Sequence, residues 1–308
     1  MNNKKLPLVS VIITTYKRAD MLERAIDSVL AQTYKEIEII VVDDNNPNTD
    51  YRIATEKTLE KYKNLYNFTY VKHSKNLNGA AARNTGINKS NGSLVTFLDD
   101  DDIYYTKKIE QQVYYLIEHQ EFDAVYCGWD RADKKVIPTK IGDLTFEILS
   151  GINLVYTNTI MIKKNVALSF QGWDERFKRN QEAAFLLRFF KNGHKIGVVS
   201  EVLVEFDISD RENASIAKKN EEDFTFFLNA HKNQIESCSN KKNNAKKIIY
   251  SYRYRGVLLA YLKSKKYNSA FKLYIKTIKV IPIRFNLDII KYVLAKLSGK
   301  DVFKEYGV

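Results

Sequence analysis

Four consecutive carboxylates, Asp99 to Asp102, follow directly after the apolar segment 93–98. Consecutive carboxylates at the end of a buried strand repel one another, so such a run calls for a compensating cation. Mg²⁺ or Mn²⁺ would suit this role, because both prefer oxygen ligands and can bridge one or two carboxylates to phosphate oxygens. Aspartates are also favoured in a solvated turn before a helix. The run alone therefore leaves a metal site and a polar turn open.

Strand-like and helix-like segments alternate in the chain that leads up to this run. The predicted strands lie at 8–13, 37–42, 68–71 and 93–98, and the predicted helices lie at 20–30 with Asp20 as cap, at 51–62, and from Asn78 onward. Short β-branched runs alternating with helices are typical of an α/β fold with a parallel sheet. Ligands of such folds bind at the carboxyl ends of the strands, where Thr14, Asp44 and Asp99 fall. We therefore expect these three residues to face one crevice.

The second half of the chain is less regular. We predict strands at 123–127, 155–162 and 196–206, and a helix at 182–190 that Gly193 ends. The pattern becomes helical from about residue 213. We therefore place an α/β domain at 1–215 and a basic, mainly helical region at 216–308.

The order and spacing of four motifs resemble the family 2 glycosyltransferases over roughly the first 200 residues. These motifs are Val9 to Arg18, Ile40 to Asn45, Gly79 to Asn84, and Phe97 to Asp102. The resemblance implies a GT-A-like, Rossmann-related domain that binds a nucleotide sugar, here followed by a C-terminal helical appendage.

The resemblance also implies which residues bind the donor. Thr14, Tyr16 and Arg18 match the nucleoside-binding motif after the first strand, and Arg83 matches an arginine that holds the nucleotide end of the donor. Asp44, rather than Asp43, matches the carboxylate that accepts a hydrogen bond from the nucleobase. An ionised carboxylate only accepts hydrogen bonds, which suits the ring N–H of uracil and favours a UDP-sugar. Without the motif register, these residues would also suit a strand-end turn and a surface arginine.

The family's Asp-x-Asp motif falls on Asp99 and Asp101. Asp99 is expected at the ribose or diphosphate side and at the metal, and Asp101 is expected to coordinate Mn²⁺ or Mg²⁺. Asp100 is more acidic than the residue usual at this position, and we include it among the donor-binding residues. Asp102 is expected to orient the loop or to act through water.

The segment Gly172 to Arg188 resembles the part of the family that carries the catalytic base, and Glu182 takes the place of the base. An inverting transferase needs a carboxylate that takes the proton of the acceptor hydroxyl. Asp174 and Glu175 are competing carboxylates, and a glutamate in the first turn of a helix is also favoured by the helix dipole. Trp173 suits either the acceptor pocket or the core.

The positive charge is concentrated at the C-terminus. Residues 241–308 contain 17 Lys and Arg but 3 Asp and Glu, whereas the whole chain has a net charge of +12. A helical bundle with lysines facing water accounts for this pattern, and such a bundle can also contact an anionic membrane surface or a partner. Nucleic acid is not expected as a partner, because no nucleic-acid-binding motif accompanies the charge.

Other patterns limit the function classes. Cys127 and Cys238 are far apart without a CxxC pattern, and no stretch resembles a signal peptide or a membrane span. These patterns favour a cytoplasmic protein. Contact with the inner face of the cell membrane is a further expectation. His73, His119, His194 and His231 lack ligand spacing. A Rossmann dehydrogenase or a nucleotidyltransferase is disfavoured, because no glycine-rich loop follows the first strand.

The expected function is therefore a metal-dependent, inverting hexosyltransferase or N-acetylhexosaminyltransferase of bacterial capsule or cell-wall polysaccharide synthesis. It would transfer a sugar from a UDP-sugar to a glycan or lipid-linked acceptor. The alternative is a non-catalytic module with a degenerate transferase fold that binds a nucleotide or a polyanion.

Overall fold

The computed structural model describes residues 6–152, 155–208 and 217–278, and residues 286, 287, 289, 290, 294 and 298. These residues form two compact units. The first unit contains the residues up to Leu144 and those from Val155 to the end of the sheet. The second unit contains the short helix α5 (Thr145–Ser150) and the helices of the C-terminal part. The chain thus reaches the second unit before it completes the first.

Strands and helices alternate in the first unit, and the second unit is helical. The strands are β1 (Val9–Thr15), β2 (Ile37–Asp43), β3 (Phe68–Lys72), β4 (Leu94–Asp99), β5 (Ile103–Tyr104), β6 (Ala124–Arg131), β7 (Lys134–Val136), β8 (Met161–Lys163) and β9 (Ile196–Glu205). The helices are α1 (Ala19–Leu30), α2 (Asp50–Leu59), η1 (Glu60–Tyr62), α3 (Gly79–Lys89), α4 (Lys108–Glu118), α5, η2 (Thr157–Thr159), α6 (Lys164–Ser169), α7 (Gln181–Lys191), α8 (Ala217–Ala230), α9 (Lys232–Lys241), α10 (Ala245–Lys263) and α11 (Tyr267–Ile278).

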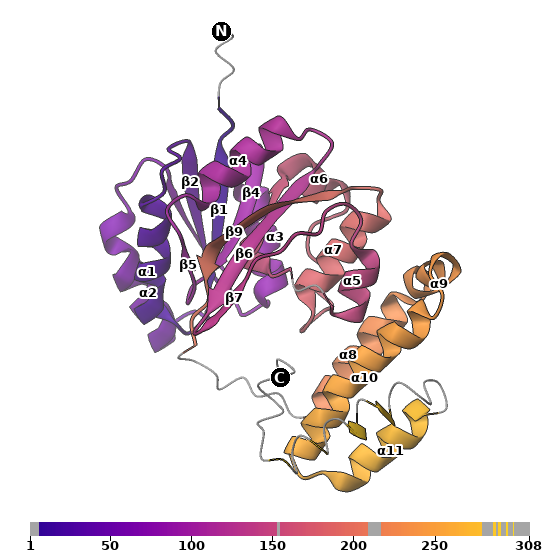
Figure 1. The fold of residues 1–308 in the computed structure, drawn as a ribbon. Helices are drawn as coiled ribbons and strands as arrows, with labels where there is room; N and C mark the ends of the chain where they lie inside the picture. The colour runs from indigo at the N-terminus through magenta and orange to yellow at the C-terminus, as the bar shows by residue number, and fades with distance from the viewer. Residues whose placement is uncertain are drawn as a thin grey trace. The chain divides into compact units, whose positions relative to one another are not determined.

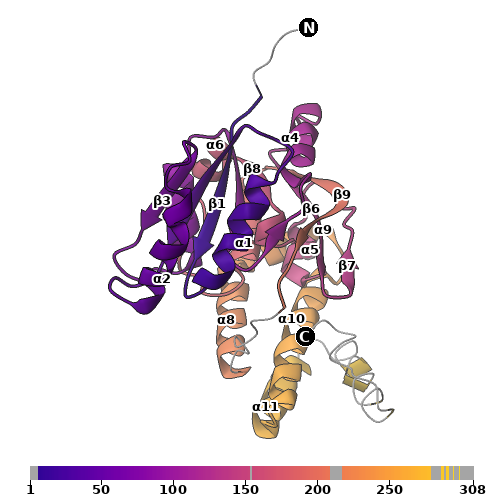
Figure 2. The same cartoon turned by 90° about the vertical axis from the view of Figure 1, so that its left-hand side faces the viewer.

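The strands of the first unit form one mixed sheet in the order β3-β2-β1-β4-β8-β6-β9-β5, with β7 paired to β6. Strands β3, β2, β1 and β4 are mutually parallel, whereas β8 is antiparallel to both β4 and β6. Figure 2 shows the sheet from β3 at one edge to β9 toward the other, with α1 in front of β1. Since β1, β2 and β4 are parallel neighbours, their carboxyl ends meet at one edge of the sheet.

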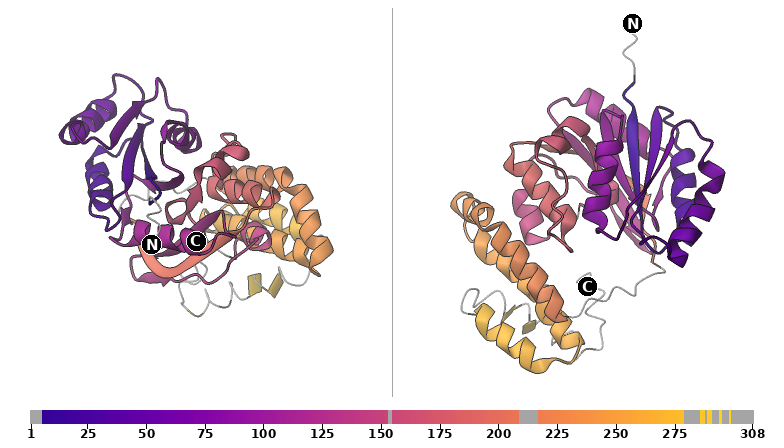
Figure 3. Two further views of the ribbon diagram at one scale, coloured as in Figure 1. Left: turned by 90° about the horizontal axis from the view of Figure 1, so that it is seen from above. Right: turned by 180° about the vertical axis from the view of Figure 1, so that it is seen from behind.

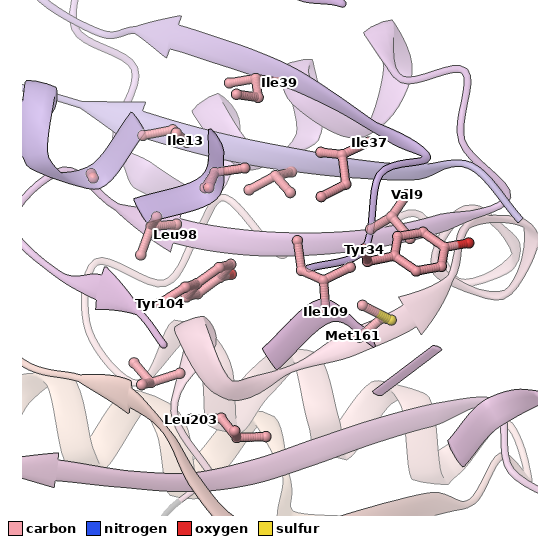
Figure 4. Packing of buried hydrophobic residues seen from close by; sticks show 14 of the residues in the cluster. Val9, Ile13, Tyr34, Ile37, Ile39, Leu98, Tyr104, Ile109, Met161 and Leu203 are labelled. Carbon is pink, nitrogen blue, oxygen red and sulfur yellow. The ribbon is translucent and has the colours of Figure 1, made fainter. Parts of the chain in front are cut away.

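Alternate residues of the parallel strands pack on opposite faces of the sheet. Val9, Ile13 and Leu98 share one cluster with α1 and α4, in which Figure 4 shows the side chains pointing toward one another. The other face carries Ile40 with Ala82 of α3, and Figure 1 shows α1 and α3 on either side of the strands. This two-sided burial explains why the strands read as continuous apolar runs.

Two sequence-based expectations about local structure are wrong. Helix α1 begins at Ala19 with Arg18 at the N-cap, so Asp20 lies inside the first turn and does not cap the helix. The predicted strand 155–162 is mostly a 3₁₀ turn, η2, and only Met161–Lys163 pair as β8. Local hydrogen bonds favour the turn here, because the side chain of Thr159 donates to the carbonyl oxygen of Tyr156 and closes the turn.

The second unit has its own small core. Apolar side chains of α10 and α11, among them Val257, Leu258 and Leu273, form one buried cluster, and the two helices lie beside each other in Figure 3. Arg253 of α10 donates from Nε to the carbonyl oxygen of Leu149 at 2.8 Å and fixes the end of α5. Cys127 of the first unit is fully buried, and both cysteines are free thiols.

Candidate active site

A cavity of about 400 Å³ lies at the carboxyl end of β4. Its walls come from segments far apart in the sequence, namely the loops after β1 and β4, the end of β6, the η2 turn, the start of α7 and the end of β9. The charged residues that line it are Arg18, Arg83, Asp99, Asp101, Asp102, Arg131, Lys178, Arg179, Glu182 and Asp207. The cavity thus brings Asp99, Asp101 and Asp102 of the acidic run together with Glu182.

The acidic run turns inward where β4 ends. Burial raises the pKa of Asp100 to about 7 and that of Asp102 to about 8, and the neighbouring Asp101 adds to both shifts. Burial also raises the pKa of Asp101, with Asp99 as the next cause. Burial is thus the main cause of these shifts, and repulsion between neighbouring carboxylates adds to it.

Arg18, which follows β1, reaches into this cluster. Its guanidinium lies 2.6 Å from Asp101 Oδ2 and 3.4 Å from Asp100 Oδ1. The neighbouring Tyr16 donates its backbone N–H to Asp100 Oδ2 at 3.1 Å, and Thr14 donates its hydroxyl to Asp99 Oδ1 at 3.5 Å. The β1 motif and the acidic run therefore contact each other directly, while the ring of Tyr16 stays 40% exposed outside the cavity wall.

Arg83 connects the acidic run to the segment that carries Glu182. It donates to Asp99 Oδ1 at 2.7 Å and to Gln181 Oε1 at 2.9 Å. Its helix α3 starts where the Asn78 side chain accepts from the N–H groups of Ala80 and Ala81. Trp173 packs under the guanidinium at 4.9 Å and stacks on Phe185, so it belongs to the core.

Asp44 is placed differently from the cavity residues. It is buried, and its carboxylate accepts from the N–H groups of Leu77 and Asn78, at 2.8 and 2.9 Å. It also lies 2.7 Å from His73 Nδ1. In this arrangement Asp44 fixes the loop before α3, and it is not among the residues that line the cavity.

Glu182 lies in the first turn of α7. The preceding Asn180 has φ of 56°, a left-handed conformation that asparagine tolerates, and this turns the chain into the helix. Glu182 lines the cavity, and its charge acts on Tyr156 across it. The competing carboxylates are engaged elsewhere, since Asp174 pairs with Arg176 at 2.6 Å and Glu175 accepts from Asn84 at 2.9 Å.

The structure adds residues that the motifs did not single out. Asn158, fully buried, accepts from the N–H of Asp99 at 3.1 Å and donates to Asp102. The backbone N–H of Asp207 donates to the other oxygen of Asp102 at 2.9 Å. No local signal could have identified these residues, because they lie 56 and 105 positions from their partner.

The acidic residues fit a divalent cation. Asp99, Asp101 and Asp102 offer hard oxygen ligands at one cavity, and a cation there would offset the repulsion between neighbouring carboxylates. Among the described residues, no three His, Cys, Asp or Glu side chains form a complete metal site. Mg²⁺ commonly uses one or two carboxylates together with substrate phosphates, so an incomplete protein site suits such a cation.

Comparison with known proteins places the chain in a family. The sequence model of glycosyl transferase family 2 matches residues 10–180. The amylovoran biosynthesis glycosyltransferase AmsB of Erwinia amylovora is 28% identical over 260 residues, covering 80% of this chain and 85% of AmsB.

Two solved structures share the fold. S. aureus TarS in complex with UDP-GlcNAc is 17% identical with a TM-score of 0.60, covering 89% of this chain and 92% of the TarS chain. The mannosyltransferase PcManGT from Pyrobaculum calidifontis, in complex with GDP-Man and Mn²⁺, is 16% identical with a TM-score of 0.60, covering 97% and 89%. These likenesses confirm the predicted GT-A-type fold. Since the family model matches more than half of the chain, the protein belongs to glycosyl transferase family 2.

Proposed function

We propose that this glycosyltransferase transfers a sugar, with inversion, from a UDP-sugar to a hydroxyl of a glycan or lipid-linked acceptor in cell-surface polysaccharide synthesis. The observation that carries the proposal is the single cavity that holds the end of the acidic run and Glu182 together. Relatives and neighbours support it, because AmsB acts in amylovoran biosynthesis and one TarS structure contains UDP-GlcNAc.

In this proposal Asp101 and Asp99 hold Mn²⁺ or Mg²⁺, which supplies positive charge for the departing diphosphate. Arg18 and Arg83 already lie against these carboxylates and would bind phosphate oxygens in the same place. The proposed donor site is completed by Thr14, Tyr16, Asp44 and Asp100. Asp44 would accept a hydrogen bond from the nucleobase, or would act indirectly through the loop before α3 that it holds.

Glu182 is the proposed base. A carboxylate there would take the proton of the acceptor hydroxyl as that oxygen attacks the anomeric carbon, while the bond to the diphosphate breaks. Arg83 bonds Gln181, the residue beside Glu182, and so couples the position of the base to the donor side. The proposal assigns transfer to residues 1–215.

The experiment compares Asp101→Asn and Glu182→Gln with the wild type. Calorimetry should show that both isosteric variants still bind UDP, with a loss at most in the part of the affinity that depends on the metal ion. The rate of sugar transfer should fall by at least about a hundredfold in both variants. Lys63→Gln, at an exposed lysine that directly follows η1, is the control. Full activity of both variants, or UDP binding that ignores Mn²⁺ in the wild type, would favour the non-catalytic binding module.

The C-terminal region 216–308 is proposed to contact an anionic membrane surface. On α11, Tyr267, Phe271 and Ile275 recur every four residues and are 62%, 64% and 40% exposed. Between residues 241 and 278 there are Lys and Arg but no Asp or Glu. An exposed apolar stripe beside lysines is typical of helices that lie in a membrane interface. Among the described residues, no helix is long and apolar enough to cross a bilayer.

Vesicle flotation tests this contact. The wild type should float with vesicles that contain phosphatidylglycerol and not with neutral phosphatidylcholine vesicles, and the triple variant Tyr267→Ser, Phe271→Ser, Ile275→Ser should stay behind. Ile53→Ser, another exposed apolar residue, serves as the control. Equal flotation of the triple variant, or binding to a soluble polyanion alone, would contradict the membrane contact.

A further inference from the structure

Three aromatic rings surround one arginine at the cavity wall. Trp129 of β6, Tyr156 before η2 and Phe206 after β9 pack edge to face, with ring centroids 5.1 to 5.5 Å apart. The guanidinium carbon of Arg131 lies 4.8 Å from the Phe206 centroid, 5.6 Å from that of Tyr156 and 5.7 Å from that of Trp129. Three rings from three separate segments thus converge on one cation.

The charge of Arg131 has little compensation. Its side chain bonds the Tyr156 hydroxyl, but its Nε is buried without a hydrogen-bond partner. In the part of the chain that the structure describes, no carboxylate forms an ion pair with Arg131. Asp102, on which its charge acts, accepts instead from Asn158 and from the Asp207 N–H. A partly buried guanidinium that forms no ion pair can bind an anionic ligand, so this arrangement favours one.

The cationic side chains of the cavity differ in whether they pair with a carboxylate. Arg18 and Arg83 are already paired with the acidic run, whereas Arg131 and Lys178 line the same cavity and form no ion pair with a carboxylate among the described residues. Tyr156 lies within electrostatic reach of both Arg131 and Glu182. Arg131 and Lys178 therefore offer positive charge in the cavity that Glu182 also lines.

We infer that Arg131, with Lys178 of the same cavity, binds an anionic group of the acceptor, a phosphate or a carboxylate, close to the hydroxyl that reacts. The inference rests on the proposed function, because Glu182 defines the acceptor side. The guanidinium presents its N–H groups to two oxygens of one anion, and the three rings hold its plane fixed. Tyr156 and Phe206, which also line the cavity, then offer aromatic surface to the sugar ring that carries the anion.

The test uses small probes on the full-length protein. Glycerol 1-phosphate and glucuronate are the anionic probes, and glycerol and glucose are their neutral counterparts. Binding is measured by saturation-transfer NMR with Mg²⁺, once with UDP present to occupy the donor side and once without. The variants are Arg131→Gln and Arg131→Lys, and the control is Arg176→Gln, which removes an exposed arginine outside the cavity.

We expect an anionic probe to bind the UDP-loaded wild type and control, with affinity at least about tenfold lower in Arg131→Gln. Arg131→Lys should keep part of the affinity, and thermal melting shows whether each variant folds. A preference for glycerol 1-phosphate or for glucuronate shows whether the anionic group of the acceptor is a phosphate or a carboxylate.

Equal binding of neutral and anionic probes, binding unchanged in both Arg131 variants, or no anion binding to the wild type would overturn the inference. Failure of the proposed function is separate, since it would appear as full sugar transfer in Asp101→Asn and Glu182→Gln, or as UDP binding that ignores Mn²⁺. In that case the titration without UDP still shows whether anion binding depends on Arg131.

Discussion

Replacing Lys108 with Met should stabilise the first unit at neutral pH. Lys108 lies in α4 and is fully buried among Thr96, Tyr104 and Cys127. Its Nζ donates to Thr96 Oγ1 at 2.6 Å and lies 3.9 Å above the Tyr104 ring. Burial lowers the pKa of Lys108 from 10.5 to about 7. The folded protein therefore carries the cost of an ammonium group that water would solvate better.

The size of the effect follows from linkage between the two pKa values. Between pH 7 and 10.5 the unfolded chain binds a proton that the folded chain does not, so this lysine's cost is greatest at low pH and shrinks as pH rises. The cost amounts to about 4 kcal/mol at pH 7 and about 2 kcal/mol at pH 9. Methionine conserves volume, and Thr96 keeps its hydrogen bond to the Ile160 carbonyl in the variant.

Urea unfolding followed by tryptophan fluorescence measures this difference, because Trp129 and Trp173 both lie in the first unit. The gain of Lys108→Met over the wild type should decline steadily from pH 7 to pH 10. Lys63→Met, at an exposed lysine, should show no such trend. A variant less stable than the wild type at pH 7, or a gain that does not change with pH, would refute the reasoning.

Two further changes test the packing around the site. Gly86→Ala in α3 would place its Cβ 2.3 Å from Ile12 Cγ2 of β1, so thermal melting should show a loss of about 1–3 kcal/mol, whereas Gly256→Ala, with open space around it, should gain about 1 kcal/mol. A Gly86→Ala protein as stable as the wild type would mean that β1 and α3 pack less tightly. Asn158→Ala removes the acceptor of the Asp99 N–H and a donor to Asp102, and should cost about 1–3 kcal/mol in urea unfolding, while the exposed Asn64→Ala should cost almost nothing. An equal response of the two asparagines would show that the buried network carries no stability.

The sequence by itself determined the α/β class, the family and the end of β4 as the acidic site. Periodicity locates buried parallel strands well, because their apolar runs are continuous, and the carboxyl ends of parallel neighbours must meet. The contact of Arg83 with Asp99 directly links the motif Gly79 to Asn84 with the motif Phe97 to Asp102. Local patterns were less informative for segment 155–162, where turn hydrogen bonds outweigh strand propensity over most of its length.

Only the tertiary structure decided what surrounds the acidic run. Asn158 and Asp207 meet Asp102 across long stretches of chain, and the ring cage of Arg131 draws on three segments. Lys108 is a similar case, since a lysine in an amphipathic helix ordinarily faces water. Such positions depend on how distant segments pack, and a pattern along the chain records only the neighbours of each residue in sequence.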